Sequence, residues 1–164
     1  MRLMLSDEYM AGLFDGEGCV MVRVWRKPNS PHIRYQPAIS LGMTYRPVIE
    51  QIHRQYGGSI HLNDHSKRNK KHRAQFNWVA SSQVAARVLR AMLPYLIVKK
   101  DEAELVLQLQ GSLDTWRNKL WNFNGVHQRR DEIMAERQNI ADRVAALKRR
   151  SFPTVDYGPI KISE

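Results

Sequence analysis

The segment Met10–Gly18, with the sequence MAGLFDGEG, constrains the fold of this chain more than any other part of it. Met10, Leu13 and Phe14 follow one another at the i, i+3, i+4 spacing, which places them on one face of a helix. Glycines on both sides of Glu17 allow the chain to leave that helix sharply. The segment therefore predicts a short apolar helix that ends in an acidic group.

Another face of this predicted helix consists of small residues. Gly12 and Gly16 are four residues apart, so they leave a groove in which a second helix backbone can lie close. The plainer alternative is an amphipathic helix with a glycine C-cap, on which Asp15 and Glu17 are merely solvated.

Basic residues dominate the part of the chain that follows. Residues 18–100 contain 15 lysines and arginines and only two acids, Glu50 and Asp64, which gives this stretch a net charge of +13. Unopposed charges at this density repel one another unless a polyanion binds, and the whole chain also carries a formal charge of +10. We therefore expect a nucleic acid as the partner.

Two alternating runs follow the motif segment. Cys19–Lys27 and Arg34–Met43 place apolar and polar side chains on opposite sides, as half-buried strands do. Ala38 falls on the polar, outer side, and Pro37 is suited only to an edge or a bulge. The spacing then becomes helical over Arg46–Tyr56, and a pair of glycines ends the helix.

The same order then repeats. Ser59–Asn63 alternates with Leu62 on its inner side, and after a basic loop a fourth strand carries Phe76 and Trp78 inward. Gln83–Leu93 is helical and ends before a proline. The order helix, two strands, helix, two strands, helix predicts an α+β fold with a four-stranded antiparallel sheet.

The outer face of all four predicted strands is polar or basic. Arginine, amide, serine and histidine side chains match the donors and acceptors that base edges present in the major groove of DNA. An ordinary solvated sheet face would carry more acids. The residues expected to contact double-stranded DNA are Arg23, Trp25, Lys27, Arg34, Gln36, Ser40, His61, Asn63, Lys70, Arg73, Gln75 and Asn77.

The segment MAGLFDGEG is similar to the motif that names the LAGLIDADG homing endonucleases. It keeps the Ala-Gly-Leu, both acidic positions and the final glycine, and the predicted order of elements is the αββαββα core of that family. The resemblance covers residues 5–110 and implies a saddle-shaped sheet that lies in the major groove, followed here by C-terminal helices. We expect one domain, with a DNA-binding and catalytic core at 1–112, a helical extension at 113–150 and an extended tail at 151–164.

The resemblance also implies an enzyme, a site-specific endonuclease that hydrolyses phosphodiester bonds with Mg²⁺ or Mn²⁺. By this resemblance Glu17, at the second acidic position, and the carbonyl of Gly16 bind the metal, whereas we expect Asp15 to have a structural role at the helix end. A carboxylate oxygen, with water and phosphate in the remaining positions, is the coordination that Mg²⁺ favours.

A basic catalytic residue is implied in the linker Pro94–Lys100. Lys99 fits the family context best and Lys100 is the alternative, while a lysine that contacts only the DNA backbone is the competing interpretation. A polar residue after the second strand helps to order the attacking water in the family. Tyr45 or Arg46 occupies that neighbourhood here, and Tyr45 is assigned to the role.

The motif occurs once, whereas cleavage of both DNA strands needs two metal-binding acids. The resemblance therefore implies a homodimer joined through the motif helix, with Ala11, Gly12, Asp15 and Gly16 at the interface. We therefore expect a long pseudo-palindromic site, and the resemblance implies that its cleavage promotes intron homing. Two alternatives use the same fold: an intron RNA maturase, and a DNA-binding regulator that needs neither metal nor Lys99.

The rest of the sequence gives general expectations. No run of 18 apolar residues predicts a membrane span, and the first 20 residues lack a signal-peptide pattern. The single cysteine, Cys19, fits an intracellular, reducing compartment, either an organelle or bacterial cytoplasm. His61 and His65 have no cysteine pair beside them, so we expect no structural zinc site. Asp131–Arg150 is expected to be helical, with Arg137 outside its apolar stripe.

Overall fold

The computed structural model describes residues 4–26, 28–29, 32–63, 74–119 and 130–149. The predicted α+β class and the order of core elements are confirmed. The elements are, in chain order, α1 (Asp7–Glu17), β1 (Gly18–Arg26), β2 (Ile33–Met43), α2 (Arg46–Tyr56), β3 (Ser59–Asn63), β4 (Gln75–Ser81), α3 (Ser82–Met92), the 3₁₀ helix η1 (Leu93–Tyr95), α4 (Lys100–Lys119) and α5 (Arg130–Lys148).

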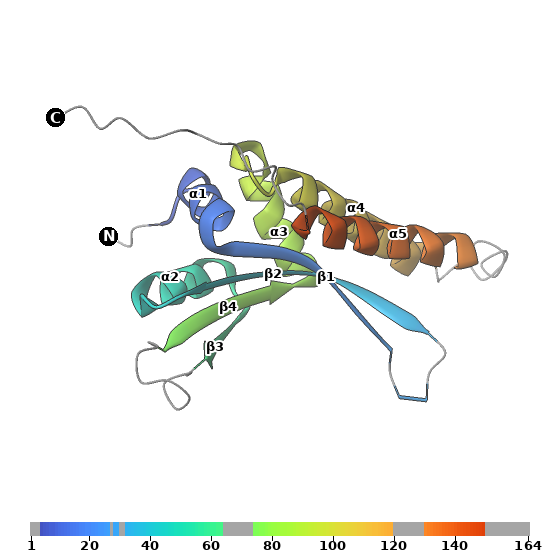
Figure 1. The fold of residues 1–164 in the computed structure, drawn as a ribbon, viewed down its shortest axis with the longest axis horizontal. Helices are drawn as coiled ribbons and strands as arrows, with labels where there is room; N and C mark the ends of the chain where they lie inside the picture. Colours follow the sequence, from blue (N-terminus) through green and yellow to red (C-terminus); the bar gives the residue numbers. More distant parts are fainter. Residues whose placement is uncertain (1–3, 27, 30–31, 64–73, 120–129, 150–164) are drawn as a thin grey trace.

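The four strands form one antiparallel sheet in the order β1-β2-β4-β3. Helices α1, α3, α4 and α5 lie on one side of the sheet, and the sheet bends so that its two ends turn away from these helices (Figure 1). We call the opposite side, which none of these four helices covers, the open face. Its arched shape agrees with the saddle that the family resemblance implied.

The pair β1–β2 extends beyond the rest of the sheet. β4 pairs with β2 only from Ala38 to Met43, so Val22–Arg26 and Ile33–Pro37 form a two-stranded segment, which we call the outer ribbon. Pro37 belongs to this segment, where β2 has a neighbour on one side only. This is the edge setting that a strand proline tolerates.

The core lies between the sheet and the helices. Phe14 from α1, Ile39 from β2, Trp78 from β4 and Leu109 from α4 are all fully buried in one apolar cluster. Burial of such side chains is the main favourable term in folding. The motif helix is therefore fixed directly on the sheet that it precedes.

The turn after α2 requires glycine at two successive positions. Gly57 and Gly58 have φ values of 80° and 89°, a region that side chains disfavour. A Cβ atom on Gly58 would lie 2.5 Å from the carbonyl oxygen of Val79, and Trp78 Nε1 donates to the Gly57 carbonyl at 2.7 Å. The turn thereby brings β3 directly beside β4.

Two side chains on the strands differ from the expectation, because the order of strands decides their exposure. Ala38 lies on the outer side but is fully buried, since β2 is an inner strand and Met21 and Ser81 flank it in register. Leu62 was expected to face inward but is 58% exposed, since β3 is an edge strand with β4 as its single neighbour in the described sheet.

The C-terminal helices also differ from the expectation in two respects. α4 runs without a break from Lys100 to Lys119, so the predicted boundary at residue 112 falls inside a helix. Arg137 was placed outside the apolar stripe of its helix but is only 6% exposed, because α5 packs against both α4 and β1. Its guanidinium donates to Ser112 Oγ at 3.1 Å and to the Ser112 carbonyl at 2.9 Å.

None of the helices within the described residues combines the length and the apolarity that crossing a membrane requires. The tail that the sequence predicted at 151–164 lies outside the described residues.

Candidate active site and nucleic-acid interface

The C-terminal end of α1 presents a carboxylate at the protein surface. Glu17 is the last residue of α1 and is exposed, and the N–H of Gly18 closes the helix on the carbonyl of Phe14. The last carbonyl groups of a helix, such as that of Gly16, have no partner inside the helix. The two metal-binding groups expected from the sequence therefore come from adjacent residues at the junction of α1 and β1.

The carboxylate of Asp15 ties α1 to the linker between η1 and α4. It accepts hydrogen bonds from the backbone N–H of Ile97 at 2.8 Å and from that of Lys99 at 3.0 Å. These bonds agree with the structural role expected for Asp15. They also direct its side chain to the linker of the same protomer, which is not the placement expected for an interface residue.

The side chain of Lys99 contacts the motif helix α1. Its Nζ donates to the backbone carbonyl of Asp15, in the last turn of α1. A positive charge is favoured at this end of a helix because the helix dipole is negative there. Lys100 is instead exposed as the first residue of α4. Of the two candidate lysines, Lys99 is thus the one that contacts the motif helix.

Tyr45 and Arg46 lie at the start of α2. Tyr45 is 64% exposed, occupies the N-cap position and makes no capping hydrogen bond through its side chain. The guanidinium of Arg46 lies 5.5 Å from the ring centroid of Phe76 and forms an ion pair with Glu50 at 2.6 Å. Arg46 is therefore engaged in local contacts, whereas Tyr45 presents its side chain to solvent.

The strand register arranges the residues expected to contact DNA in rows across the open face. Side chains that are directly opposite in an antiparallel pair lie on the same face of the sheet. Polar and basic rows lie at both ends, and the middle is more apolar. From the outer ribbon towards β3 the rows are Trp25–Arg34, Arg23–Gln36, Met21–Ala38–Ser81, Cys19–Ser40–Val79–Ser59, Gly42–Asn77–His61 and Gln75–Asn63.

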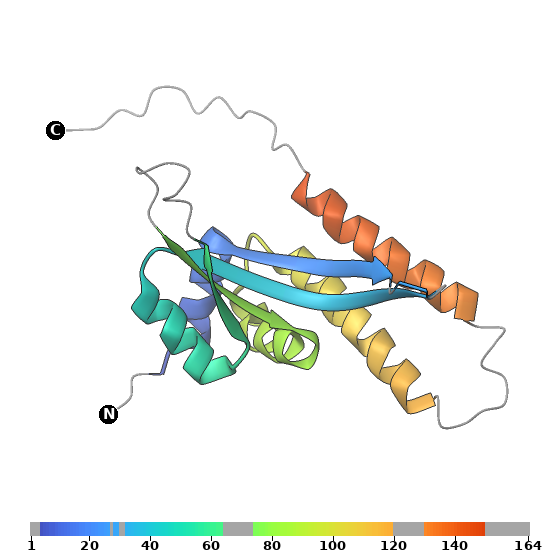
Figure 2. The same cartoon turned by 90° about the horizontal axis from the view of Figure 1, so that it is seen from below.

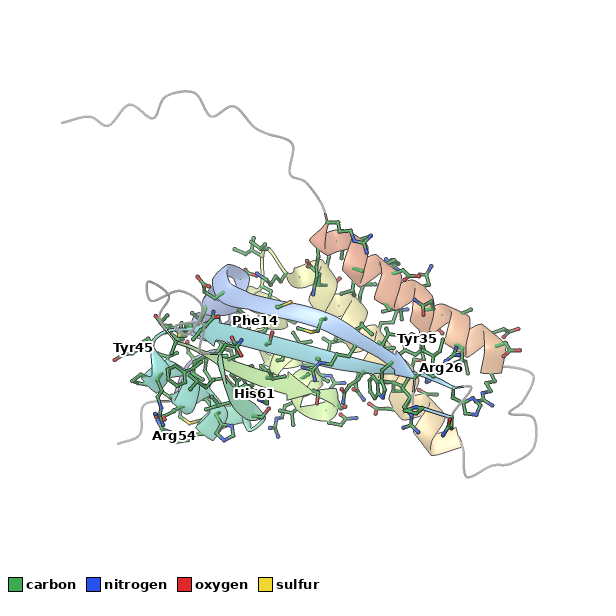
Figure 3. All side chains as sticks on the ribbon, turned by 60° about the horizontal axis from the view of Figure 1, so that its bottom comes forward. Phe14, Arg26, Tyr35, Tyr45, Arg54 and His61 are labelled. Carbon is green, nitrogen blue, oxygen red and sulfur yellow. The ribbon has the colours of Figure 1, made fainter. Side chains whose placement is uncertain are left out.

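The side chains in these rows differ in how exposed they are and in the hydrogen bonds that they make. Exposed side chains in these rows include those of Arg23, Arg34 and Trp25. His61 is also exposed, on the edge strand β3 (Figure 3), and Ser59 Oγ lies 3.0 Å from its Nε2. Gln36 is half-buried and donates from Nε2 to Ser82 Oγ at 3.1 Å. The expected contacts at Lys27, Lys70 and Arg73 lie outside the described residues.

Gly42 was not assigned a function from the sequence, but it makes room for two of the expected DNA contacts. A Cβ atom there would lie 2.0 Å from Asn77 Oδ1 and 2.8 Å from Gln75 Nε2. Both amide groups therefore lie over the Gly42 backbone. A glycine inside a strand is the signal that can indicate such a close approach.

The glycine face of α1 is uncovered in the protomer. Gly12 and Gly16 are exposed, and a Cβ atom built on either has no atom within 4 Å outside the neighbouring backbone. Ala11 is different, since it is fully buried in the core. Within the protomer, α1 thus presents Gly12 and Gly16 but not Ala11 at its surface, and the dimer interface itself stays a prediction.

Solved structures with the same architecture include several DNA complexes. The homing endonuclease I-CvuI in complex with its target superposes with a TM-score of 0.68 at 18% identity, over 91% of this chain and 85% of that one. The archaeal intron-encoded I-Vdi141I, in complex with DNA, gives 0.66 at 17% identity over 92% and 88%. The LAGLIDADG homing endonuclease I-LtrWI, bound to target DNA, gives 0.60 at 17% over 87% of this chain and 45% of that one.

This chain has the LAGLIDADG homing-endonuclease fold. Within the LAGLIDADG fold, the segment that resembled the family motif comprises the last eight residues of α1 and the first residue of β1. No family model and no curated protein matches the sequence. The assignment of the LAGLIDADG fold therefore rests on the structure together with this motif.

Proposed function

We propose that this chain is a homing endonuclease that hydrolyses both strands of a long pseudo-palindromic DNA site with Mg²⁺ or Mn²⁺. The observation that carries the proposal is the convergence of Glu17 and Lys99 on the last turn of α1, where that helix enters the sheet. The solved structures support the DNA-binding and divalent-metal parts of the proposal, because I-CvuI was crystallised with its target and Ca²⁺, and also with a DNA target and Mg²⁺, where that DNA was not cleaved.

The donors at the end of α1 fit a hard divalent cation. The Glu17 carboxylate and the Gly16 carbonyl would hold it, and both provide oxygen, the donor that Mg²⁺ and Mn²⁺ prefer. Among the described residues, no group of three or more His, Cys, Asp or Glu side chains gathers as a zinc site requires. When bound, the ion supplies charge neutralisation on the phosphate and a more acidic water.

The protein's own groups position and neutralise the scissile phosphate. The ammonium of Lys99 has three N–H donors, of which one contacts the Asp15 carbonyl. The others can donate to a phosphate oxygen and stabilise the charge that develops on it. Asp15 holds the Lys99 backbone in place, and Tyr45 is the solvent-exposed candidate for ordering water.

We also propose that two protomers associate through Gly12 and Gly16. One protomer has one such acid at the end of one motif helix, and it corresponds to 45% of the length of I-LtrWI. A twofold dimer provides two Glu17 carboxylates and two open faces, which explains why the site would be pseudo-palindromic. Intron homing belongs to the proposal, as does an intracellular, reducing location, which the single cysteine favours.

Selection from a randomised double-stranded DNA library tests this function. The protein is incubated with the library in Mg²⁺ or in EDTA, and both bound molecules and new ends are sequenced. We expect ends at a pseudo-palindromic sequence in Mg²⁺ and bound, uncut molecules of the same sequence in EDTA. Binding without ends in Mg²⁺ would favour the regulator, and affinity for RNA alone would favour the maturase; either result contradicts the proposal.

A further inference from the structure

The outer ribbon carries four of the residues expected to contact DNA, but it has no neighbouring strand in the described sheet. Within the outer ribbon, β1 and β2 pair with each other and with no other described strand. A two-stranded segment by itself is only marginally stable in water. The positions of its exposed side chains therefore depend on whatever else contacts the ribbon.

Helix α5 contacts the β1–β2 pair at three points along its length. Lys148 Nζ lies 3.1 Å from Cys19 Sγ at the start of β1, and Tyr35 OH donates to Gln138 Oε1 at 2.8 Å within the outer ribbon. Arg130 Nη2 lies 3.0 Å from His32 Nε2 immediately before β2. The three contacts are thus spread along the pair, and the view from below shows α5 crossing its outer part at an angle (Figure 2).

The central contact is protected from water. Tyr35 is 7% exposed, and burial together with the nearby Asp142 carboxylate raises the pKa of its hydroxyl, so that the group stays protonated and donates. α5 is itself fixed, because Ile140 and Val144 are buried in the core and Arg137 is bonded to α4.

We propose that α5 fixes the outer ribbon through the Tyr35–Gln138 hydrogen bond and thereby determines the preference for the base pairs that the ribbon contacts. The inference rests on the proposed function. The outer ribbon lies at the end of the sheet far from α1 (Figure 1). In a dimer joined at α1, these are the base pairs farthest from the centre of the site. Tyr35 and Gln138 are positioning residues, since they act on DNA through Arg23, Arg34 and their neighbours.

The variant Tyr35→Phe removes the hydroxyl and keeps the ring. We expect the preference at the outermost base pairs of each half-site to fall about fivefold, the effect of one net hydrogen bond, with the inner base pairs unchanged. Tyr56→Phe is the matched control, because Tyr56 is 8% exposed and its hydroxyl contacts Asp7 at 3.4 Å, away from the ribbon. The base-pair preferences of Tyr56→Phe should equal those of the wild type.

Hydrogen exchange of the free protein tests the same contact without DNA. Amides of Val22–Arg26 should exchange about fivefold faster in Tyr35→Phe than in the wild type or in Tyr56→Phe. Gln138→Met should reproduce the effect, and the double variant should be no worse than either single variant.

The outcomes separate this inference from the proposed function. Wild-type protein that selects no DNA sequence contradicts the proposed function, while the exchange experiment still reports on the contact. Unchanged exchange in Tyr35→Phe overturns the inference. The inference is also overturned if the wild type selects a DNA sequence and Tyr35→Phe shows the same preference at the outermost base pairs. In that case the Tyr35–Gln138 contact does not govern recognition.

Discussion

Asp15 and Glu17 lie two residues apart on α1, but their surroundings differ. The Asp15 carboxylate accepts two backbone N–H groups of the linker, whereas the Glu17 carboxylate is exposed at the end of the helix. An acid already bonded to backbone amides stabilises structure, and an exposed one beside a carbonyl at the helix end, such as that of Gly16, can bind a cation.

Replacement of Glu17 by Gln should abolish cleavage and leave DNA binding nearly unchanged. The amide keeps the shape but loses the negative charge that binds the metal, so we expect the cleavage rate to fall about a hundredfold or more. Cleavage and binding of the selected site are measured in parallel. Glu104→Gln, at an exposed acid of α4, is the control. An active Glu17→Gln enzyme would exclude this acid as the metal ligand.

Replacement of Asp15 by Asn should weaken both folding and cleavage. The amide NH₂ faces one of the two linker N–H groups, so one hydrogen bond is lost, and we expect a loss of about 1 kcal/mol in the free energy of unfolding. Cleavage should decrease more than DNA binding, because the linker that positions the Lys99 side chain beside α1 is then held by one hydrogen bond fewer. Chemical denaturation and single-turnover cleavage measure the two effects. Unchanged stability would show that these bonds contribute nothing in solution.

The sequence predicted the acids at the helix end, but it did not predict what Asp15 contacts. Ile97 and Lys99 lie 82 and 84 residues further along the chain. Helical spacing describes neighbours within one turn or two, so a hydrogen bond over such a separation is visible only in the folded chain.

At the scale of the elements, periodicity located the strands and helices well. Arg46–Tyr56 and Ser59–Asn63 have the predicted bounds, because alternation and glycine pairs mark such ends clearly. Periodicity does not give the order of strands in the sheet, so the burial of Ala38 and the exposure of Leu62 were not predicted. The buried face predicted for α5 was also too narrow, since Arg137, which was placed outside it, is buried against α4.

A side chain at Gly42 should alter DNA recognition more than stability. The Cβ of Gly42→Ala collides with the flexible ends of Asn77 and Gln75, which can rotate away, so we expect the free energy of unfolding to change by less than about 1 kcal/mol. The base preference opposite this row should change. Gly111→Ala, where a Cβ meets nothing within 4 Å, is the control and should keep the preference profile. Equal profiles for both variants would contradict contact between this row and DNA.

At the scale of the whole molecule, the proposed dimer depends on the uncovered glycine face of α1. Gly12→Leu has room in the protomer, so the variant should fold. It should sediment as a monomer, bind DNA weakly and make no double-strand breaks, because the larger side chain separates the two motif helices. Gly111→Leu is the control for a leucine at an exposed helical glycine and should remain dimeric. A dimeric Gly12→Leu protein would point to another interface.

The separate attachment of the outer ribbon has a consequence for how such a protein changes its target over evolutionary time. The ribbon is fixed from its inner side, where Tyr35 is buried, while Arg23 and Arg34 on the outer side are exposed. Substitutions at the exposed positions therefore leave the packing of the protomer intact. Glu17 and Lys99 are held by other contacts, at α1. On the proposed function, new target sequences are thus accessible through single surface substitutions that preserve both folding and the proposed cleavage site, which also makes the outer ribbon the natural segment to randomise when a new specificity is engineered.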